Sequence, residues 1–301
     1  AVLENRRLML NQTAEGIINR DPSIWMAQGE AAAKDIVQWF GWLTAPTEFQ
    51  KPERTEPVNA LKEELQREGI TNVVVLGTGG SGLGIRTYAQ TFKKDNLRVV
   101  DLEDPQEIRD VMKWVDEKGW DKTVFVVSSK SWGTTETRNQ EAIFREVLAK
   151  KIGADNVTQH FVAITDEGKM EPGEEASFRA VFINNRKTDA AQGLEIGGRY
   201  SSDSFFSMVP AELAGIPHDR LLKDAENEYN SFVAEKGEYI GVKIGESLDR
   251  FRKAGRNKVT FILSEGIEPF GPWAQQLGNE SIGKKEDSVV FVTGEGFSEG
   301  M

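Results

Sequence analysis

The sequence feature that most constrains the fold is a short apolar run ending in a cluster of glycines, TNVVVLGTGGSGLG, at residues 71–84. Residues 73–76 include no polar side chain, which is typical of a strand buried on both faces of a parallel sheet. Five of the next eight residues, the glycine loop of residues 77–84, are glycine, so the backbone can approach a ligand closely. A helix predicted to begin near Gly82 would add amide groups and a partial positive charge. The segment predicts the first strand and turn of an α/β unit and favours phosphate binding over an empty tight turn.

The composition of the chain excludes several classes of protein. The 301 residues carry a net charge of −11 without a basic block, which argues against binding to nucleic acid or to an anionic membrane surface. There is no cysteine, and the two histidines are His160 and His218, so we expect no disulfide framework, no thiolate chemistry and no metal site. No apolar run could span a bilayer and no signal-peptide profile is visible, so a cytoplasmic protein is the simplest interpretation.

Helices and strands alternate regularly through the middle of the chain. The predicted strands lie at residues 72–77, 97–102, 122–128, 159–165 and 178–183. This alternation predicts a parallel sheet with helices on both faces, and a ligand site beyond the carboxyl ends of the strands. Two helices, residues 3–19 and residues 21–40, and a proline-containing linker at residues 44–57 are predicted before the sheet.

The same pattern restarts near residue 216. Helices at residues 219–234 and 240–254 lead to a strand at residues 258–264, a helix at residues 269–279 and a last strand at residues 288–292. Two strands are marginal alone, so this part must lean on the first domain or be completed by something else. The predicted division is an N-terminal helical segment, residues 1–45, a first domain, residues 46–215, and the start of a second, truncated domain, residues 216–301.

A second candidate loop follows the predicted strand at residues 122–128. The sequence SSKSWGTTET, the hydroxyl loop of residues 128–137, holds six serine or threonine residues and Lys130 at the start of a predicted helix. An ordinary helix N-cap with a capping box explains one or two of these hydroxyl groups. A phosphate dianion accepts short hydrogen bonds from several hydroxyls and amides, with a lysine as a point charge. The loop therefore predicts a second phosphate-binding element.

The stretch EIGGRYS, the arginine segment of residues 195–201, pairs two glycines with Arg199. Glycines allow the backbone to lie close to a site into which an arginine projects. Taken alone, the segment is explained equally well as a surface turn.

One interpretation of the glycine loop is a dinucleotide site. Gly77, Gly79 and Gly82 spell G-x-G-x-x-G, and Asp101 ends the next predicted strand at about the spacing of a ribose-binding acid. These features predict an NAD-dependent dehydrogenase. They leave the hydroxyl loop, the arginine segment and a later GNESIGK stretch without a role.

A second interpretation uses all of these features. GTGGSGLG, SSKSWGTTET, HFVAITD, GGRYS and QQLGNESIGK, in this order over residues 73–284, resemble the phosphoglucose isomerase family, which is built from two sugar-isomerase (SIS) domains. The resemblance implies a three-layer α/β sandwich of the SIS type. It also implies reversible conversion of glucose 6-phosphate and fructose 6-phosphate through a cis-enediolate, without metal or nucleotide cofactor, in a homodimer.

The resemblance also implies roles for individual residues. Glu280 matches the base that moves a proton between C1 and C2, Arg199 the arginine that stabilises the enediolate, and Gln276 a glutamine that contacts the substrate. The positions that match the sugar-phosphate site, or flank it, are Gly80, Ser81, Ser129, Lys130, Ser131, Thr134 and Thr135. The chemistry agrees, because removing a proton next to a carbonyl needs a placed carboxylate, and a fixed cation lowers the energy of the developing oxyanion. The alternative for Glu280 is a solvated carboxylate at a helix end.

The resemblance is incomplete. The family also uses a histidine lent by the partner subunit and a C-terminal lysine to open the sugar ring, and neither motif is present in this sequence. His160 lies in a predicted strand and is better explained as a structural residue, while His218 is a weak substitute. Gly82 and Trp132 differ from the usual family residues. A third interpretation is therefore a sugar-phosphate-binding SIS module, or a fragment of a larger isomerase without full activity.

Overall fold

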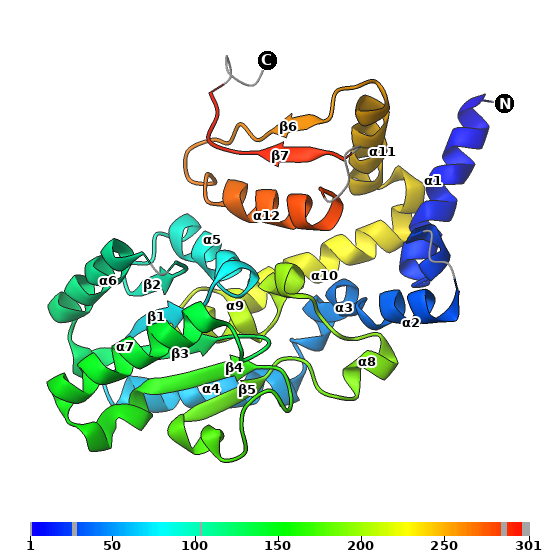
Figure 1. Cartoon of the computed structure of the whole chain (residues 1–301). Coiled ribbons are helices and arrows are strands. Elements are labelled where there is room, and N and C mark those ends of the chain that lie inside the picture. The colour runs from blue at the N-terminus through cyan, green and yellow to red at the C-terminus, as the bar shows by residue number, and fades with distance from the viewer. Residues whose placement is uncertain (1, 26–28, 103, 284–287, 297–301) are drawn as a thin grey trace.

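The computed structural model describes residues 2–25, 29–102, 104–283 and 288–296 (Figure 1). At its centre lies a parallel sheet in the order β2-β1-β3-β4-β5. Its strands are β1 (Asn72–Leu76), β2 (Leu97–Val100), β3 (Thr123–Ser128), β4 (Phe161–Thr165) and β5 (Ala180–Ile183). With this order the strand sequence reverses between β1 and β3, and such a switch point is where doubly wound sheets bind ligands. The glycine loop follows β1 and the hydroxyl loop follows β3, so both loops stand at this point.

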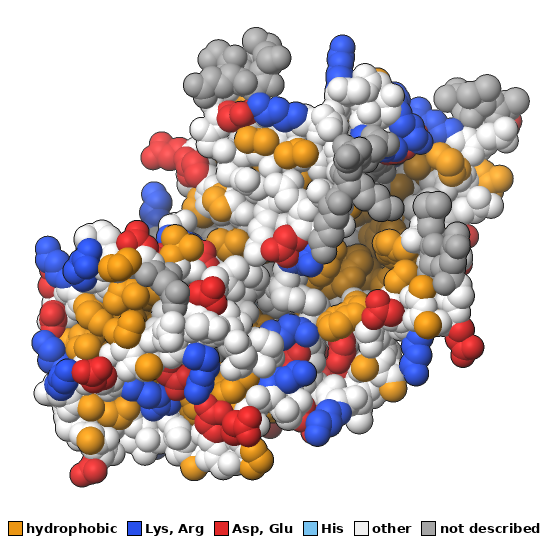
Figure 2. All heavy atoms as spheres, in the orientation of Figure 1, with side chains coloured by type: hydrophobic (Ala, Val, Ile, Leu, Met, Phe, Trp, Pro, Cys, Tyr) orange, Lys and Arg blue, Asp and Glu red, His pale blue; other side chains and the backbone are white. Residues whose placement is uncertain are grey.

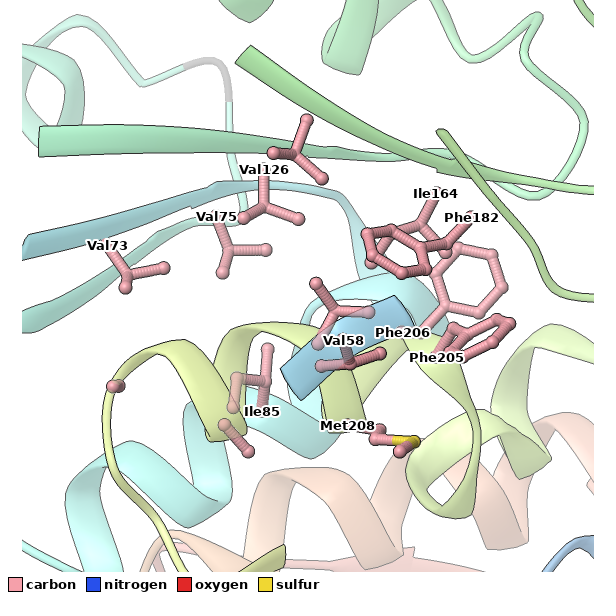
Figure 3. Packing of buried hydrophobic residues seen from close by; sticks show 14 of the residues in the cluster. Val58, Val73, Val75, Ile85, Val126, Ile164, Phe182, Phe205, Phe206 and Met208 are labelled. Atoms are coloured by element: carbon pink, nitrogen blue, oxygen red, sulfur yellow. The ribbon is translucent and has the colours of Figure 1, made fainter. Parts of the chain in front are cut away.

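Helices cover both faces of the sheet and complete a three-layer α/β sandwich, as the sequence predicted. The helices of one face are α4 (Pro52–Arg67), α5 (Leu83–Thr91) and α9 (Phe205–Leu213), and those of the other are α6 (Pro105–Lys118) and α7 (Thr135–Ile152). Figure 3 shows Val75 and Phe182 pointing from their strands toward Val58 and Phe206 on the first face. All residues of β1, β3 and β4 are buried, which is why their sequences are almost unbroken apolar runs.

Local signals set the boundaries of α6. The Asp104 side chain accepts a hydrogen bond from the amide of Gln106 at 2.8 Å, and Pro105 occupies the first turn, so α6 begins there. The helix ends at Gly119, whose φ of 105° lies outside the range of most other residues.

The region before the sheet differs from the prediction. Its elements are α1 (Val2–Ile18), the 3₁₀ turn η1 (Pro22–Trp25), α2 (Glu30–Gln38) and α3 (Gly41–Glu48). The single helix predicted at residues 21–40 is wrong, because Gly29 has a φ of 83° and α2 begins only after it. Part of that predicted helix, residues 26–28, lies outside the described residues.

The linker predicted at residues 44–57 is also wrong, because α3 and α4 occupy most of it. Pro46 and Pro57 lie inside these helices, and Pro52 begins α4, where a missing amide costs little. Val58, Leu61 and Leu65 of α4 are buried against the sheet. This burial outweighs the local preference of the prolines for a loop.

The predicted second α/β pattern is present after α9. It consists of α10 (His218–Glu235), α11 (Ile240–Lys253), β6 (Lys258–Thr260), α12 (Phe270–Ile282) and β7 (Val290–Val292). The strands β6 and β7 pair in parallel, and β6 is shorter than the predicted strand at residues 258–264. As expected for so small a sheet, this part leans on the first: the Thr87 hydroxyl of α5 donates to the carbonyl of Pro269 at 3.1 Å, just before α12.

Shorter elements connect these parts. They are α8 (Asp189–Gln192) and the 3₁₀ turns η2 (Gly79–Ser81), η3 (Trp120–Lys122), η4 (Ala154–His160), η5 (Glu174–Ser177), η6 (Gly198–Asp203) and η7 (Lys236–Glu238). A cavity of about 780 Å³ with a mostly apolar lining lies among α1, α3, α10 and α11, and Figure 2 shows it as a hollow with hydrophobic side chains. None of the described helices has the length and apolar character needed to cross a membrane.

Candidate active site

The glycine loop lies directly against the arginine segment. A Cβ atom placed on Gly80 would be 2.5 Å from the carbonyl group of Gly198, too close for any other residue at this position. The Ser201 hydroxyl donates to the carbonyl of Gly80 at 3.0 Å. The interpretation of residues 195–201 as a free surface turn is therefore wrong, and Gly80 serves to bring Arg199 against the loop. Ser81 is partly exposed in the same turn.

The hydroxyl loop is fixed at both ends by the sheet and by α7. Ser129 is buried, its amide donates to the carbonyl of Ile164 at 3.0 Å, and its hydroxyl donates to that of Thr134 at 3.3 Å. Thr134 is the N-cap residue of α7, yet its side chain makes no capping hydrogen bond. The capping alternative therefore does not describe this loop. Ser131 and Thr135 are exposed in it and available to a ligand.

The two loops touch each other. A Cβ atom placed on Gly77 would lie 2.8 Å from the Cβ of Ser128, so the turns after β1 and β3 adjoin. Lys130, predicted as a point charge for the phosphate, already has two partners. Its ammonium forms an ion pair with Asp166 at 3.0 Å and lies 4.7 Å from the ring centre of Trp39.

Helix α12 carries the predicted acid to the arginine segment. The Arg199 Nε lies 3.2 Å from a Glu280 carboxylate oxygen, and the Gln276 amide donates to the other oxygen at 3.1 Å. The Tyr200 hydroxyl and the Ser281 hydroxyl are 3.0 Å apart, which joins the same two elements again. The Gln276 amide nitrogen would also be 3.1 Å from a Cβ on Gly79. Glu280, Gln276 and Arg199 therefore meet beside the glycine loop.

The sequence matches a known family over most of this architecture. A family model described as phosphoglucose isomerase matches residues 62–293. The chain belongs to the phosphoglucose isomerase family. The matched range includes both loops, the arginine segment and α12.

Individual members of the phosphoglucose isomerase family resemble the chain over part of their length. Glucose-6-phosphate isomerase of Thermus thermophilus is 28% identical over 248 residues, which are 81% of this chain and 56% of that protein. The chain thus spans little more than half the length of this relative.

Solved structures show the same fold. The crystal structure of a hypothetical protein from Thermus thermophilus gives a TM-score of 0.76 at 24% identity, covering 99% of this chain and 66% of that one. The crystal structure of a glucose-6-phosphate isomerase from Chlamydia trachomatis gives a TM-score of 0.66 at 23% identity, covering 94% of this chain and 53% of that one.

In this phosphoglucose isomerase family member, Asp101 supports the glycine loop. One carboxylate oxygen accepts the amide of Gly79 at 2.7 Å, and the other lies 3.5 Å from a guanidinium nitrogen of Arg86. Burial raises the pKa of Asp101, and the Gly79 amide and Arg86 oppose that shift. The carboxylate that a dinucleotide fingerprint would place on a ribose is thus occupied in holding the loop, which removes the main support for the dehydrogenase alternative.

Neither histidine faces this cluster. His160 is buried at the end of η4, with Nδ1 2.8 Å from the carbonyl oxygen of Thr123, which confirms a structural role. His218 is fully buried next to Tyr88, and burial lowers its pKa to about 4, so it is neutral at pH 7. Within the described part of the chain, no group of three or more histidine or carboxylate side chains is placed to hold a metal ion.

Two buried polar residues behind the site escaped the sequence interpretation. Asp166 is the last residue of the HFVAITD stretch and follows β4, and Asn185 follows β5. Both residues follow consecutive predicted strands, and the carboxyl ends of parallel strands share one edge of the sheet. This position was the signal in the sequence that could have placed them near the site.

Proposed function

We propose that the chain carries the sugar-phosphate site of an aldose–ketose isomerase that acts on a hexose 6-phosphate, converting glucose 6-phosphate and fructose 6-phosphate. The observation that carries the proposal is the meeting of Glu280, Gln276 and Arg199 beside two phosphate-type loops. The relatives named glucose-6-phosphate isomerase support the same reaction.

The phosphate group of the substrate belongs at the two loops. Ser131, Thr135 and Ser81 offer hydroxyls there, and Ser129 and Thr134 form the wall behind them. Helix α7 begins at Thr135, so its amide groups and dipole favour a dianion at this position. We assign the phosphate to these hydroxyls and to the backbone near Gly80. Lys130, which is paired with Asp166, contributes its positive charge from beside them.

The proton transfer belongs to α12 and η6. The Glu280 carboxylate takes the proton from C2 of the open-chain aldose, and the electron pair moves into a C1–C2 double bond, leaving negative charge on the C1 oxygen. Arg199 is the fixed cation that stabilises the negative charge of this cis-enediolate. A proton passes from the C2 hydroxyl to the C1 oxygen, and Glu280 returns its proton to C1, which yields the ketose. Gln276 holds the Glu280 carboxylate in place.

The wider assembly belongs to the same proposal. We assign residues 46–215 to a first SIS domain and residues 216–301 to the start of a second one, after an N-terminal helical segment of residues 1–45. A cytoplasmic homodimer is proposed on the family resemblance. A sugar-phosphate-binding module without activity is the second candidate, and the direct pairing of Arg199 with Glu280 argues against it, because binding alone needs neither.

Ligand-induced stabilisation tests the proposal. Fructose 6-phosphate or a phosphorylated aldonic acid should raise the melting temperature, since a ligand at 100 times its Kd stabilises the folded form by about 2.7 kcal/mol. The double variant Ser129→Ala, Thr134→Ala should lose much of this shift and Glu280→Gln should keep it. A shift with NAD and none with the sugar phosphates would overturn the proposal in favour of the dehydrogenase.

A further inference from the structure

Asp166 and Asn185 form a buried polar pair behind the candidate site. Asp166 directly follows β4 and is 6% exposed, and Asn185 follows β5 and is 3% exposed. One Asp166 carboxylate oxygen accepts a hydrogen bond from the backbone amide of Asn185 at 3.1 Å. The other accepts one from the side-chain amide of Asn185 at 3.0 Å. Such groups remain buried only when their hydrogen bonds are made.

The pair is joined to the hydroxyl loop through Asp166. The Lys130 ammonium lies 3.0 Å from the same carboxylate, and the backbone amide of Asp166 donates to the carbonyl of Lys130 at 3.2 Å. The Thr165 hydroxyl donates to that carbonyl as well, at 3.3 Å. Residue 130, in the centre of the hydroxyl loop, is therefore held by its side chain and by its backbone.

The pair is joined to the arginine segment through Asn185. Its side-chain oxygen accepts the amide of Ile196 at 2.9 Å, and its side-chain nitrogen donates to the carbonyl of Ile196 at 3.1 Å. This two-way pairing with one backbone unit needs a donor and an acceptor on the same side chain, and the second amide hydrogen is used by Asp166. A carboxylate or an aliphatic side chain of the same size lacks this combination of a donor and an acceptor.

Arg199 thus lies between two anchors. Ile196, three residues before it, is held by Asn185, and Ser201, two residues after it, is bonded to Gly80 of the glycine loop. We infer that Asp166 and Asn185 are positioning residues, which fix the arginine segment relative to the hydroxyl loop and so place Arg199 with respect to the bound phosphate. The kinetic consequence rests on the proposed isomerase function, but the anchoring itself does not.

The inference predicts a particular kinetic defect. Arg199 acts on charge that develops in the reaction, so a loosened segment affects the transition state more than the bound substrate. A misplacement of about 1 Å costs on the order of 10²-fold in rate. The phosphate hydroxyls of the hydroxyl loop belong to a separate segment, so KM is expected to change much less than kcat.

Asn185→Ala provides the test, with Glu167→Gln as the matched control. The exposed Glu167 carboxylate accepts the amide of Lys187 at 2.8 Å and so connects the same two strand ends without touching the arginine segment. We expect Asn185→Ala to accelerate hydrogen–deuterium exchange of the Ile196 amide and of peptides covering residues 196–201, and to lower kcat by about 10- to 100-fold. The control should change neither.

The outcomes separate this inference from the proposed function. Wild-type protein that exchanges no C2 proton in the sugar phosphate contradicts the isomerase, while the hydrogen–deuterium exchange of residues 196–201 still tests the anchoring. If Asn185→Ala does not fold, Asp166→Asn keeps the side-chain shape but has one acceptor oxygen instead of two, so one of the two hydrogen bonds from Asn185 is lost and the same peptides should loosen. Unchanged exchange at residues 196–201 in the folded variant, or equal losses in kcat and in phosphate affinity, would overturn the positioning role.

Discussion

The candidate site has two walls that are held in different ways. One wall consists of the loops after β1 and β3, whose strands are fully buried, and Ser129 in it is 1% exposed. The other wall is α12, where the side chain of Glu280 is 46% exposed and the supporting strands β6 and β7 have three residues each. Ile282 and Val290 beside it are exposed.

Because the two walls are held differently, substitutions in them should have different effects on the stability of the fold and on the reaction. Groups that bind the phosphate rest on the core of the sheet, so changing that wall should alter folding and binding together. Groups that move the proton rest on an exposed helix with few buried contacts, so changes there should alter the reaction and leave folding almost intact. Substitutions at Glu280, at the pair Trp132 and Trp273, and at Asp203 test this contrast.

The largest effect is expected at the exposed wall. Glu280→Gln keeps the size of the side chain but removes the proton acceptor, so exchange of the C2 proton of a bound hexose 6-phosphate with solvent should fall about 10²- to 10⁴-fold. NMR in D₂O measures this exchange, and the free energy of unfolding should change by less than about 0.5 kcal/mol.

Glu268→Gln is the control for this variant, because Glu268 lies just before α12 and its carboxylate caps the amide of Gly266. It should leave proton exchange unchanged. Exchange at the parental rate in Glu280→Gln would show that Glu280 is not the base.

The sheet and its loops could be predicted from the sequence because their signals are local. The apolar runs of β1, β3 and β4 and the glycines after β1 identify a buried parallel sheet with a switch point. The helical course of residues 44–57 could not be predicted, because burial of Val58 and Leu61 against the sheet overrides the prolines.

The site could be predicted only in part for the same reason. The hydroxyls of residues 128–137 are visible as a cluster, but the pairing of Lys130 with Asp166 depends on two strand ends meeting. The approach of Glu280 to Arg199, 81 positions apart, was predicted from the family resemblance and not from any local pattern.

A smaller effect is expected at the buried wall, on stability. Trp132 of the hydroxyl loop is buried, packs against Phe178 and Arg138, and has a φ of 58°. Trp132→Ala should lower the free energy of unfolding by about 3–5 kcal/mol through lost packing. Trp132→Gly should be more stable than the alanine variant by about 1 kcal/mol, because glycine adopts a positive φ without steric cost.

Trp273 in α12 supplies the matched pair for the exposed wall, and urea unfolding measures all four variants. Trp273 is partly exposed and helical, so Trp273→Ala should cost less than Trp132→Ala, and here glycine should be less stable than alanine by about 1 kcal/mol. The same order of alanine and glycine at both positions would contradict the strained backbone assigned to the hydroxyl loop.

The smallest effect is expected where the walls join, at Asp203 in η6. Burial raises the pKa of Asp203 to about 6, opposed by a hydrogen bond with Tyr88. A carboxyl group whose pKa is higher in the folded than in the unfolded protein stabilises the fold most below about pH 4, the unfolded pKa, and that stabilisation is lost as pH rises through about 6. The free energy of unfolding of the wild type minus that of Asp203→Asn should therefore fall by about 1–3 kcal/mol from pH 4 to pH 7 and then stay constant.

Asp203 lines the cavity among α1, α3, α10 and α11, and the carboxylates of Glu246 and Asp249 around this cavity should not affect the difference. Glu246 pairs with Arg6 and Asp249 with Lys253, which lowers the pKa of each carboxyl, and both pairs are retained in Asp203→Asn. Their contribution to stability rises with pH in both proteins and cancels on subtraction. A difference that is flat from pH 4 to pH 7 would mean that Asp203 is as well solvated as in the unfolded chain, and η6 would then be grouped with the exposed wall of the site.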